Sequence, residues 1–167
     1  MSIYNVALLN IIKGDKMNKL ISKNDFKYYT YLKQILIDLE LTNKEYYWLI
    51  SDIEAYPKNK EYEELLKKDY VLLTTSELMK MLNEEDFQWI WAVFSVVPID
   101  YTKEDILKYD LPYCASYYNQ EYNPFDKEPR LQHPLAKFEL YAVDSTYIFI
   151  VTEDIELIDR FKKNYLV

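Results

Sequence analysis

The residues best suited to nucleophilic chemistry in this sequence are a single cysteine, Cys114, and a single histidine, His133. A thiolate is populated at neutral pH only beside a base or a cation, and a nearby histidine can fill that role. The two residues share one segment of the chain, but their separation follows no catalytic spacing, and Pro134 comes directly after His133. We therefore expect Cys114 to be a small buried apolar side chain, and we assign no catalytic residue.

Two carboxylates, Asp52 and Glu54, offer a second kind of chemistry. They are two residues apart in an expected strand, so period-2 alternation places them on one face, beyond Trp48 and Ile50. Paired carboxylates can bind a divalent cation or divide the roles of general acid and general base. We favour the simpler interpretation that the strand emerges into solvent before Pro57, because solvated carboxylates are the commoner case.

Several classes of site are excluded by what the sequence lacks. Its one glycine, Gly14, cannot build the glycine-rich loops that cradle phosphates or dinucleotides. One cysteine and one histidine cannot form a zinc knuckle or a redox pair. We therefore expect no cofactor and no metal site, and we interpret the acidic run of Glu84, Glu85 and Asp86 as a solvated helix end.

Composition predicts a folded, acidic protein. Half of the 167 residues are apolar and 17% are aromatic, which suits a single domain spanning residues 1–167. The formal net charge of −8 opposes nucleic acid and favours a basic protein partner, although solubility alone explains it equally well. No apolar segment approaches the roughly 20 residues that span a bilayer, and no leader pattern is visible, so we expect a cytoplasmic protein without membrane contact.

The elements that must position these residues predict an α+β fold. We expect a mainly antiparallel, mixed sheet of about five to six strands, with a long helix in the N-terminal half and a C-terminal helix packed on it. The strands are expected at 3–12, 46–56, 70–73, 87–97, 138–143 and 147–151, and the helices at 25–39, 60–68, 77–82, after Thr102 and from Thr152 or Asp154 onwards.

Three of these elements carry detailed expectations. Apolar residues at helical spacing define the helix over 25–39, with Ser22 and Asp25 as its cap. The strand at 87–97 is apolar on both faces and should be central, with Phe87, Trp89, Trp91 and Val93 on one face. In the hairpin, Val143 is expected opposite Ile148, and Tyr141 opposite Ile150.

An irregular segment at 111–135 contains four of the six prolines and several tyrosines. Long stretches without regular structure in a compact domain tend to be functional or mobile. The 18 tyrosines of the chain exceed what one core can bury, which suits a recognition surface, although compositional bias explains the excess equally well. The candidate partner-binding residues are Asp52, Glu54, Tyr113, Tyr117, Tyr118, Tyr122, Phe125, Asp126 and Glu128.

Three segments carry a resemblance to known proteins: residues 45–57 (EYYWLISDIEAYP), the tryptophan strand at 87–98, and the hairpin FELYAVDSTYIFIV with its helix. Their aromatic placement resembles that of small uncharacterised bacterial domains, both domain-of-unknown-function families of Gram-positive bacteria and the acidic immunity proteins of toxin systems. The resemblance covers most of the chain and implies a binding role. It transfers no catalytic residue.

Our leading hypothesis is therefore a non-catalytic protein-binding domain, an immunity protein or inhibitor that neutralises a basic partner such as a nuclease toxin. Two alternatives stay open. One is a hydrolase of small or carbohydrate substrates that uses Asp52 and Glu54. The other is an assembly subunit in which the 111–135 segment docks another chain. The sequence does not predict the oligomeric state.

Overall fold

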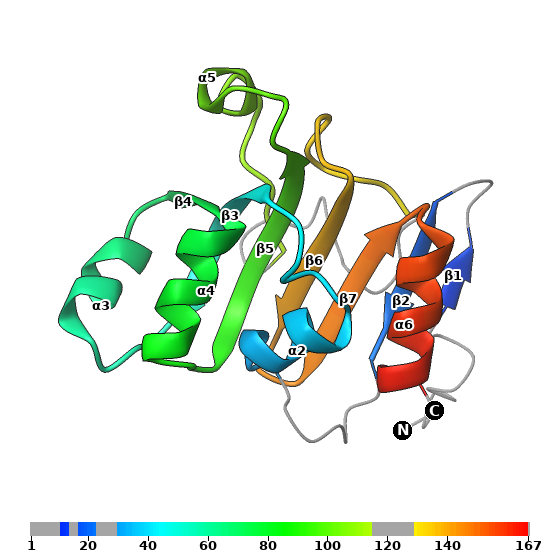
Figure 1. Cartoon of the computed structure of the whole chain (residues 1–167), viewed down its shortest axis with the longest axis horizontal. Helices are drawn as coiled ribbons and strands as arrows, with labels where there is room; N and C mark the ends of the chain where they lie inside the picture. The colour runs from blue at the N-terminus through cyan, green and yellow to red at the C-terminus, as the bar shows by residue number, and fades with distance from the viewer. Residues whose placement is uncertain (1–10, 14–16, 23–29, 115–128, 167) are drawn as a thin grey trace, which may run out of the picture.

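One antiparallel sheet organises the part of the chain that the computed structural model describes, residues 11–13, 17–22, 30–114 and 129–166. Six antiparallel pairings join its seven strands in the order β1-β2-β7-β6-β5-β3-β4 (Figure 1). The α+β class is confirmed, but the described pairings are all antiparallel, so the sheet is not mixed. The strands are β1 (Ile11–Lys13), β2 (Asn18–Ile21), β3 (Tyr46–Ala55), β4 (Tyr70–Thr74), β5 (Trp89–Pro98), β6 (Phe138–Val143) and β7 (Tyr147–Thr152).

Five helices accompany the sheet in the described part of the chain. Three of them, α2, α4 and α6, cover one face of the sheet (Figure 1). Capping boxes start α4 at Thr74 and α5 at Thr102, and the carboxylate of Asp154 accepts two backbone N–H groups at the start of α6. The helices are α2 (Leu32–Asp38), α3 (Lys60–Leu66), α4 (Thr75–Glu84), α5 (Lys103–Ile106) and α6 (Ile155–Tyr165).

The long helix expected over 25–39 is wrong in its extent, because α2 has seven residues and begins at Leu32. Thr30 and Tyr31 instead run beside the start of β5. The Trp89 N–H donates to the Thr30 carbonyl at 3.3 Å, and Tyr31 forms an isolated β-bridge with Gln88, just before β5. A backbone that pairs with a strand cannot also contribute to a helical ladder, so the helix starts after these residues.

The prediction that Ser22 caps that helix is also wrong, because Ser22 pairs with β7 instead. Its N–H donates to the carbonyl of Ile148, and its hydroxyl accepts the Ile148 N–H, each at 2.9 Å. Ser22 therefore extends the pairing of β2 with β7. The other expected cap residue, Asp25, lies outside the described residues.

Apolar side chains are buried on both faces of the sheet, as expected for β5. The larger core lies between the sheet and helices α2, α4 and α6, and Leu66 of α3 also belongs to it. On the opposite face, Val93, Tyr141 and Phe149 pack with Cys114 of the irregular segment, while Leu49, Val97 and Ile106 form a smaller cluster. Described residues of the irregular segment and Ile106 of α5 thus pack on the face opposite α2, α4 and α6.

The tryptophans depart from simple alternation at the start of β5. Trp89 lies in the core under the helices, with its ring 5.0 Å from that of Phe94 and 4.9 Å from that of Phe87. Trp91 packs beside Val93 on the opposite face, so the expected shared face is wrong. The pairing of β3 with β5 is irregular at this point, and such an irregularity interrupts the two-residue period. Trp89 is nonetheless fully buried, which confirms its place in the core.

The hairpin of β6 and β7 is confirmed, but its register differs by one residue from the expected one. Val143 lies opposite Tyr147, and Tyr141 lies opposite Phe149. Asp144 and Ser145 have φ of 50° and 57°, and the N–H of Thr146 donates to the carbonyl of Val143. This turn leaves three residues between the strands, so odd-numbered residues pair with odd-numbered ones and even-numbered with even-numbered ones.

Candidate binding surface

Asp52 sits at an irregularity of β3 and contacts the irregular segment. Its φ is 51°, and the pairing with β5 shifts between Ser51 and Glu54. The half-buried carboxylate accepts the N–H of Cys114 with Oδ2 at 2.7 Å. Period-2 alternation predicted that Asp52 and Glu54 share one face of the strand. The irregularity interrupts that alternation between the two residues. Asp52 helps to hold the residues that follow Pro112 against the sheet.

Glu54 lies near the end of β3 and is exposed. Its Oε1 accepts the hydroxyl of Tyr56 at 3.3 Å, and the Tyr56 side chain is 72% exposed. Tyr56 also lines a hollow at this end of the sheet. Glu54 thus contacts a residue of that hollow but does not line it.

The irregular segment contributes one described residue to the predicted partner-binding set, Tyr113. It is half-buried, its N–H donates to Oε1 of Gln132 at 3.1 Å, and its carbonyl accepts the Gln132 side-chain amide at 2.8 Å. These paired bonds join the two ends of the segment. The remaining predicted residues of this segment lie outside the described residues: Tyr117, Tyr118, Tyr122, Phe125, Asp126 and Glu128.

Cys114 and His133 are each engaged within the fold. Burial, followed by the nearby charge of Asp52, raises the pKa of the Cys114 thiol well above its usual range, and the sulfur lies 3.7 Å from the Ala142 carbonyl oxygen. The Nδ1 atom of buried His133 accepts the Leu135 N–H, so Nε2 carries the proton and donates to a backbone carbonyl at 2.9 Å. A protonated thiol and a fully hydrogen-bonded imidazole do not form a nucleophile and its base.

A buried carboxylate, Glu139, was missed by the sequence analysis. Its Oε1 accepts the Ser95 hydroxyl at 3.0 Å and the His133 N–H at 2.9 Å, while Oε2 accepts the Gln132 N–H at 2.9 Å and the Tyr141 hydroxyl at 2.6 Å. These four bonds fasten the end of the irregular segment to β5 and β6. A glutamate inside the apolar strand FELYAV was the available signal, because a charge there must be solvated by the protein itself.

A hollow of about 600 Å³ lies where β5 begins, and we name it the acidic hollow. It brings together the end of β3, the end of α4 and the turn between β6 and β7. Three carboxylates and one lysine carry its charge, and the exposed rings of two tyrosines lie on its wall. Its lining residues are Tyr31, Tyr56, Lys58, Asn59, Glu84, Glu85, Asp86, Phe87, Gln88, Ile90 and Ser145.

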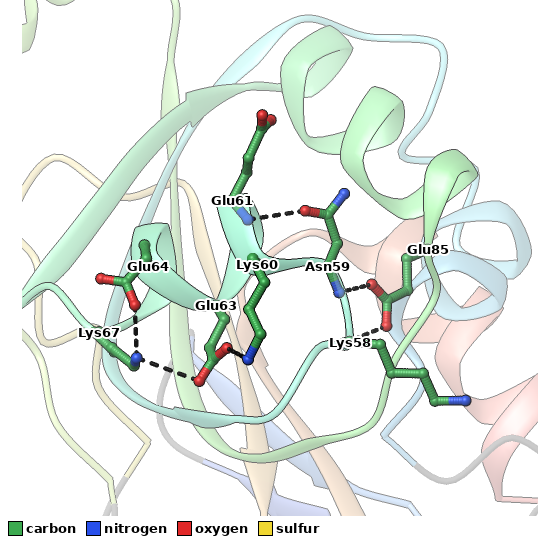
Figure 2. Close-up of polar contacts among 8 residues, drawn as sticks. All are labelled: Lys58, Asn59, Lys60, Glu61, Glu63, Glu64, Lys67 and Glu85. Carbon is green, nitrogen blue, oxygen red and sulfur yellow. Dashed lines mark hydrogen bonds and ion pairs between the residues drawn. The ribbon is translucent and has the colours of Figure 1, made fainter.

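The carboxylates of the acidic hollow differ in how they are held. Glu85 accepts the N–H groups of Lys58 and Asn59 at 2.6 and 2.8 Å, which ties the end of α4 to the start of α3 (Figure 2). Glu84 accepts the hydroxyl of Tyr62, and this bond raises the pKa of Tyr62 to about 12. These bonds place negative charge at fixed positions on the wall.

Asp86 is the third carboxylate of the acidic hollow. Partial desolvation raises its pKa, and the N–H of Lys33 at 3.5 Å acts in the opposite direction. The expectation that residues 84–86 form a solvated helix end is thus incomplete, because all three side chains line a concave surface. Sequence alone could not show this, since the wall is completed by residues from distant strands.

Ion pairs on α3 stabilise that helix and add no site. Lys60 pairs with Glu63, and Lys67 pairs with Glu63 and Glu64, all at spacings of three or four residues (Figure 2). Exposed pairs of this kind contribute little to stability, because solvent screens the charges and the long side chains lose entropy.

In the described ranges, no group of three or more histidine, cysteine, aspartate or glutamate side chains is arranged to hold a metal ion. No helix among these residues has the length and apolar character needed to cross a bilayer. Comparison of the chain with protein-family models, curated proteins and solved structures finds no match.

Proposed function

We propose that this chain is a non-catalytic protein-binding domain that engages a basic partner protein through the acidic hollow and its tyrosine rim. The observation that carries this proposal is the convergence of Glu84, Glu85 and Asp86 with Tyr31 and Tyr56 around one concave surface. A lysine or arginine side chain of a partner can be surrounded there by carboxylates and by aromatic faces. Tyrosine adds large contact area at a small cost in side-chain entropy.

The net charge of the chain supports the same choice of partner. At −8, the field of the whole molecule attracts a basic surface and repels nucleic acid. The finer proposal is an immunity protein or inhibitor of bacterial origin that covers the active site of a basic enzyme, such as a nuclease toxin. A cytoplasmic location accords with a single buried thiol, because reducing compartments keep thiols free.

Two other functions remain as proposals without a specific supporting contact. A hydrolase would use Asp52 and Glu54, yet Asp52 accepts a backbone N–H and Glu54 accepts the Tyr56 hydroxyl. Activity lost on Asp52→Asn and Glu54→Gln would favour that function. An assembly subunit would reveal itself by its mass in solution.

The test begins with affinity capture from the native host, followed by association kinetics with the purified partner. We expect the association rate to fall steeply as salt rises, because steering by surface charge is screened within about 10 Å at 0.1 M salt. Tyr56→Ala should weaken binding by about tenfold or more if this ring is an anchor. Tyr101→Ala is the matched control, because Tyr101 is also exposed and lies outside the lining of the acidic hollow.

A partner of acidic surface, or an association rate that does not change with salt, would contradict the proposal. Equal effects of Tyr56→Ala and Tyr101→Ala would remove the acidic hollow as the binding surface.

A further inference from the structure

The sheet ends at β4, and this margin is open. β4 pairs with β3 along one side, from Tyr70 opposite Ser51 to Thr74 opposite Tyr47. No described strand pairs with its other side, because β4 is the last strand of the sheet order (Figure 1). Five residues in a strand extend about 17 Å, and alternate residues of an edge strand turn their N–H and C=O groups outward. At the end of β4, the N–H of Thr74 already donates to the carboxylate of Glu77.

A groove follows this open margin, and we name it the β4 groove. Its volume is about 600 Å³, and it extends from the end of α3, past β4, to α5. Leucine and valine side chains form its floor. The lining residues are Leu65, Lys67, Lys68, Asp69, Tyr70, Val71, Leu72, Leu73, Lys103 and Leu107.

The charge of the β4 groove is opposite to that of the molecule. Three lysines and one aspartate line it, whereas the chain as a whole carries −8. Lys67 is compensated by Glu63 and Glu64, but Lys68 has no ion pair with any described residue. Lys103 lies over the ring of Tyr47 at 5.9 Å, so its charge is held beside the margin.

We propose that the outer margin of β4 binds an extended acidic segment of a partner protein by strand addition. Backbone hydrogen bonds to β4 supply the pairing, and acidic side chains of the segment lie beside the lysines that line the β4 groove. Lys68 lies next to the start of the strand and Lys103 lies on α5. This site is separate from the acidic hollow and does not depend on the function proposed above.

Charge selects an acidic segment over a second copy of this chain. Two β4 margins paired about a twofold axis run antiparallel, so the start of one strand, beside Lys68, would face the end of the other, beside Lys103. Like charges across a strand pair are destabilising, and two bodies of −8 repel at longer range. The free protein is therefore expected to be monomeric at this margin.

The test uses a short synthetic peptide that alternates valine with glutamate, and nuclear magnetic resonance of the isotope-labelled protein. We expect the peptide to shift the backbone amide resonances of residues 70–74 and to slow their hydrogen exchange. The variant Lys68→Glu/Lys103→Glu should weaken this binding by at least about tenfold. Lys80→Glu is the control, because Lys80 is an exposed lysine of α4 that does not line the β4 groove.

Two further peptides separate strand addition from binding through side chains or charge alone. A peptide with an N-methyl group on every residue retains its side chains but has no backbone N–H donor on either edge, so it should not bind. A peptide with lysine in place of each glutamate should not bind either. The proposal is overturned if the acidic peptide leaves residues 70–74 unchanged, if either of these peptides binds as well as the acidic one, or if the free protein dimerises through β4. If the lysines serve only to prevent edge-to-edge association between molecules, the acidic peptide will leave residues 70–74 unchanged.

Discussion

Glu139→Gln is the substitution that most directly tests the role of Glu139 on the second face of the sheet. The side chain is fully buried, and each of its two oxygens accepts one hydroxyl and one backbone N–H. Glutamine has the same shape but replaces one oxygen with an amide group that only donates. We expect the variant to fold with a clear loss of stability.

The size of this loss follows from the arrangement of the donors. The Ser95 and Tyr141 hydroxyls can rotate to accept a bond, but the N–H groups of Gln132 and His133 cannot. Those two N–H groups bond to different oxygens, so either orientation of the new amide leaves one of them facing a donor. Losing a hydrogen bond to a charged acceptor and burying the orphaned donor costs about 3 kcal/mol, a large share of the roughly 5–15 kcal/mol typical of a domain.

Urea unfolding followed by tryptophan fluorescence measures this loss of stability, and two control variants provide the comparison. Ser95→Ala removes one donor while Oε1 keeps the His133 N–H, so we expect a loss of about 1 kcal/mol. Glu153→Gln makes the same chemical change on an exposed residue and should fall within about 0.5 kcal/mol of the parent protein.

Hydrogen exchange adds a local measurement. Exchange at the amides of Gln132 and His133 should accelerate in Glu139→Gln, because their acceptor is partly lost. If Glu139→Gln is as stable as Glu153→Gln, then Glu139 does not fasten the irregular segment and the reasoning fails.

Three more predictions concern single residues. Trp89→Ala should lower the free energy of unfolding by about 3–5 kcal/mol, because it leaves a cavity in the main core. Trp91→Ala, at a half-buried site, should lower it less. Equal melting temperatures of the two variants would contradict this prediction. The thiol of Cys114 should react with a disulfide reagent only after unfolding, because burial raises its pKa, and rapid reaction of the native protein would show that it is accessible. The hydrogen bond from Lys108, with those from Thr102, lowers the pKa of Asp105 to about 2. The stability that the ionised Asp105 contributes is therefore present above pH 3.8 and is lost as the pH falls towards 2. Lys108→Ala should raise the pKa of Asp105, which a carboxylate titration by nuclear magnetic resonance measures.

Several elements could be predicted from sequence because local signals act within a few residues. The strands β3 and β4 and the helices α3, α4 and α5 match the expected ranges closely. Thr102 and Asp154 cap the helices that follow them, as expected. Capping residues, turn residues and strong apolar runs report their structure because their partners are close in the chain.

The failures occur where a distant partner outweighs the local pattern. Residues 25–39 have helical spacing, but Thr30 pairs with Trp89 and Tyr31 pairs with Gln88, more than fifty residues away. The two-residue period predicts that Trp89 shares a face with Trp91 and Val93. At the irregular pairing of β3 with β5, Trp89 instead faces the main core on the opposite side of the sheet. Periodicity records only the preferences of one segment, so it cannot show these competing bonds.

The candidate site was likewise predictable from the sequence only in part. From sequence alone, the net charge of −8, the single glycine and the single cysteine and histidine already exclude phosphate-cradling loops and thiol–metal sites, because those sites need residue types that are scarce here. Only the tertiary structure engages Cys114 and His133 within the fold, buries Glu139 under four donors, and joins residues 84–86 to Tyr31 and Tyr56 in one acidic hollow. Composition limits which groups are present, whereas their chemistry depends on burial and on hydrogen-bond partners, and the sheet brings those partners from strands far apart in the chain.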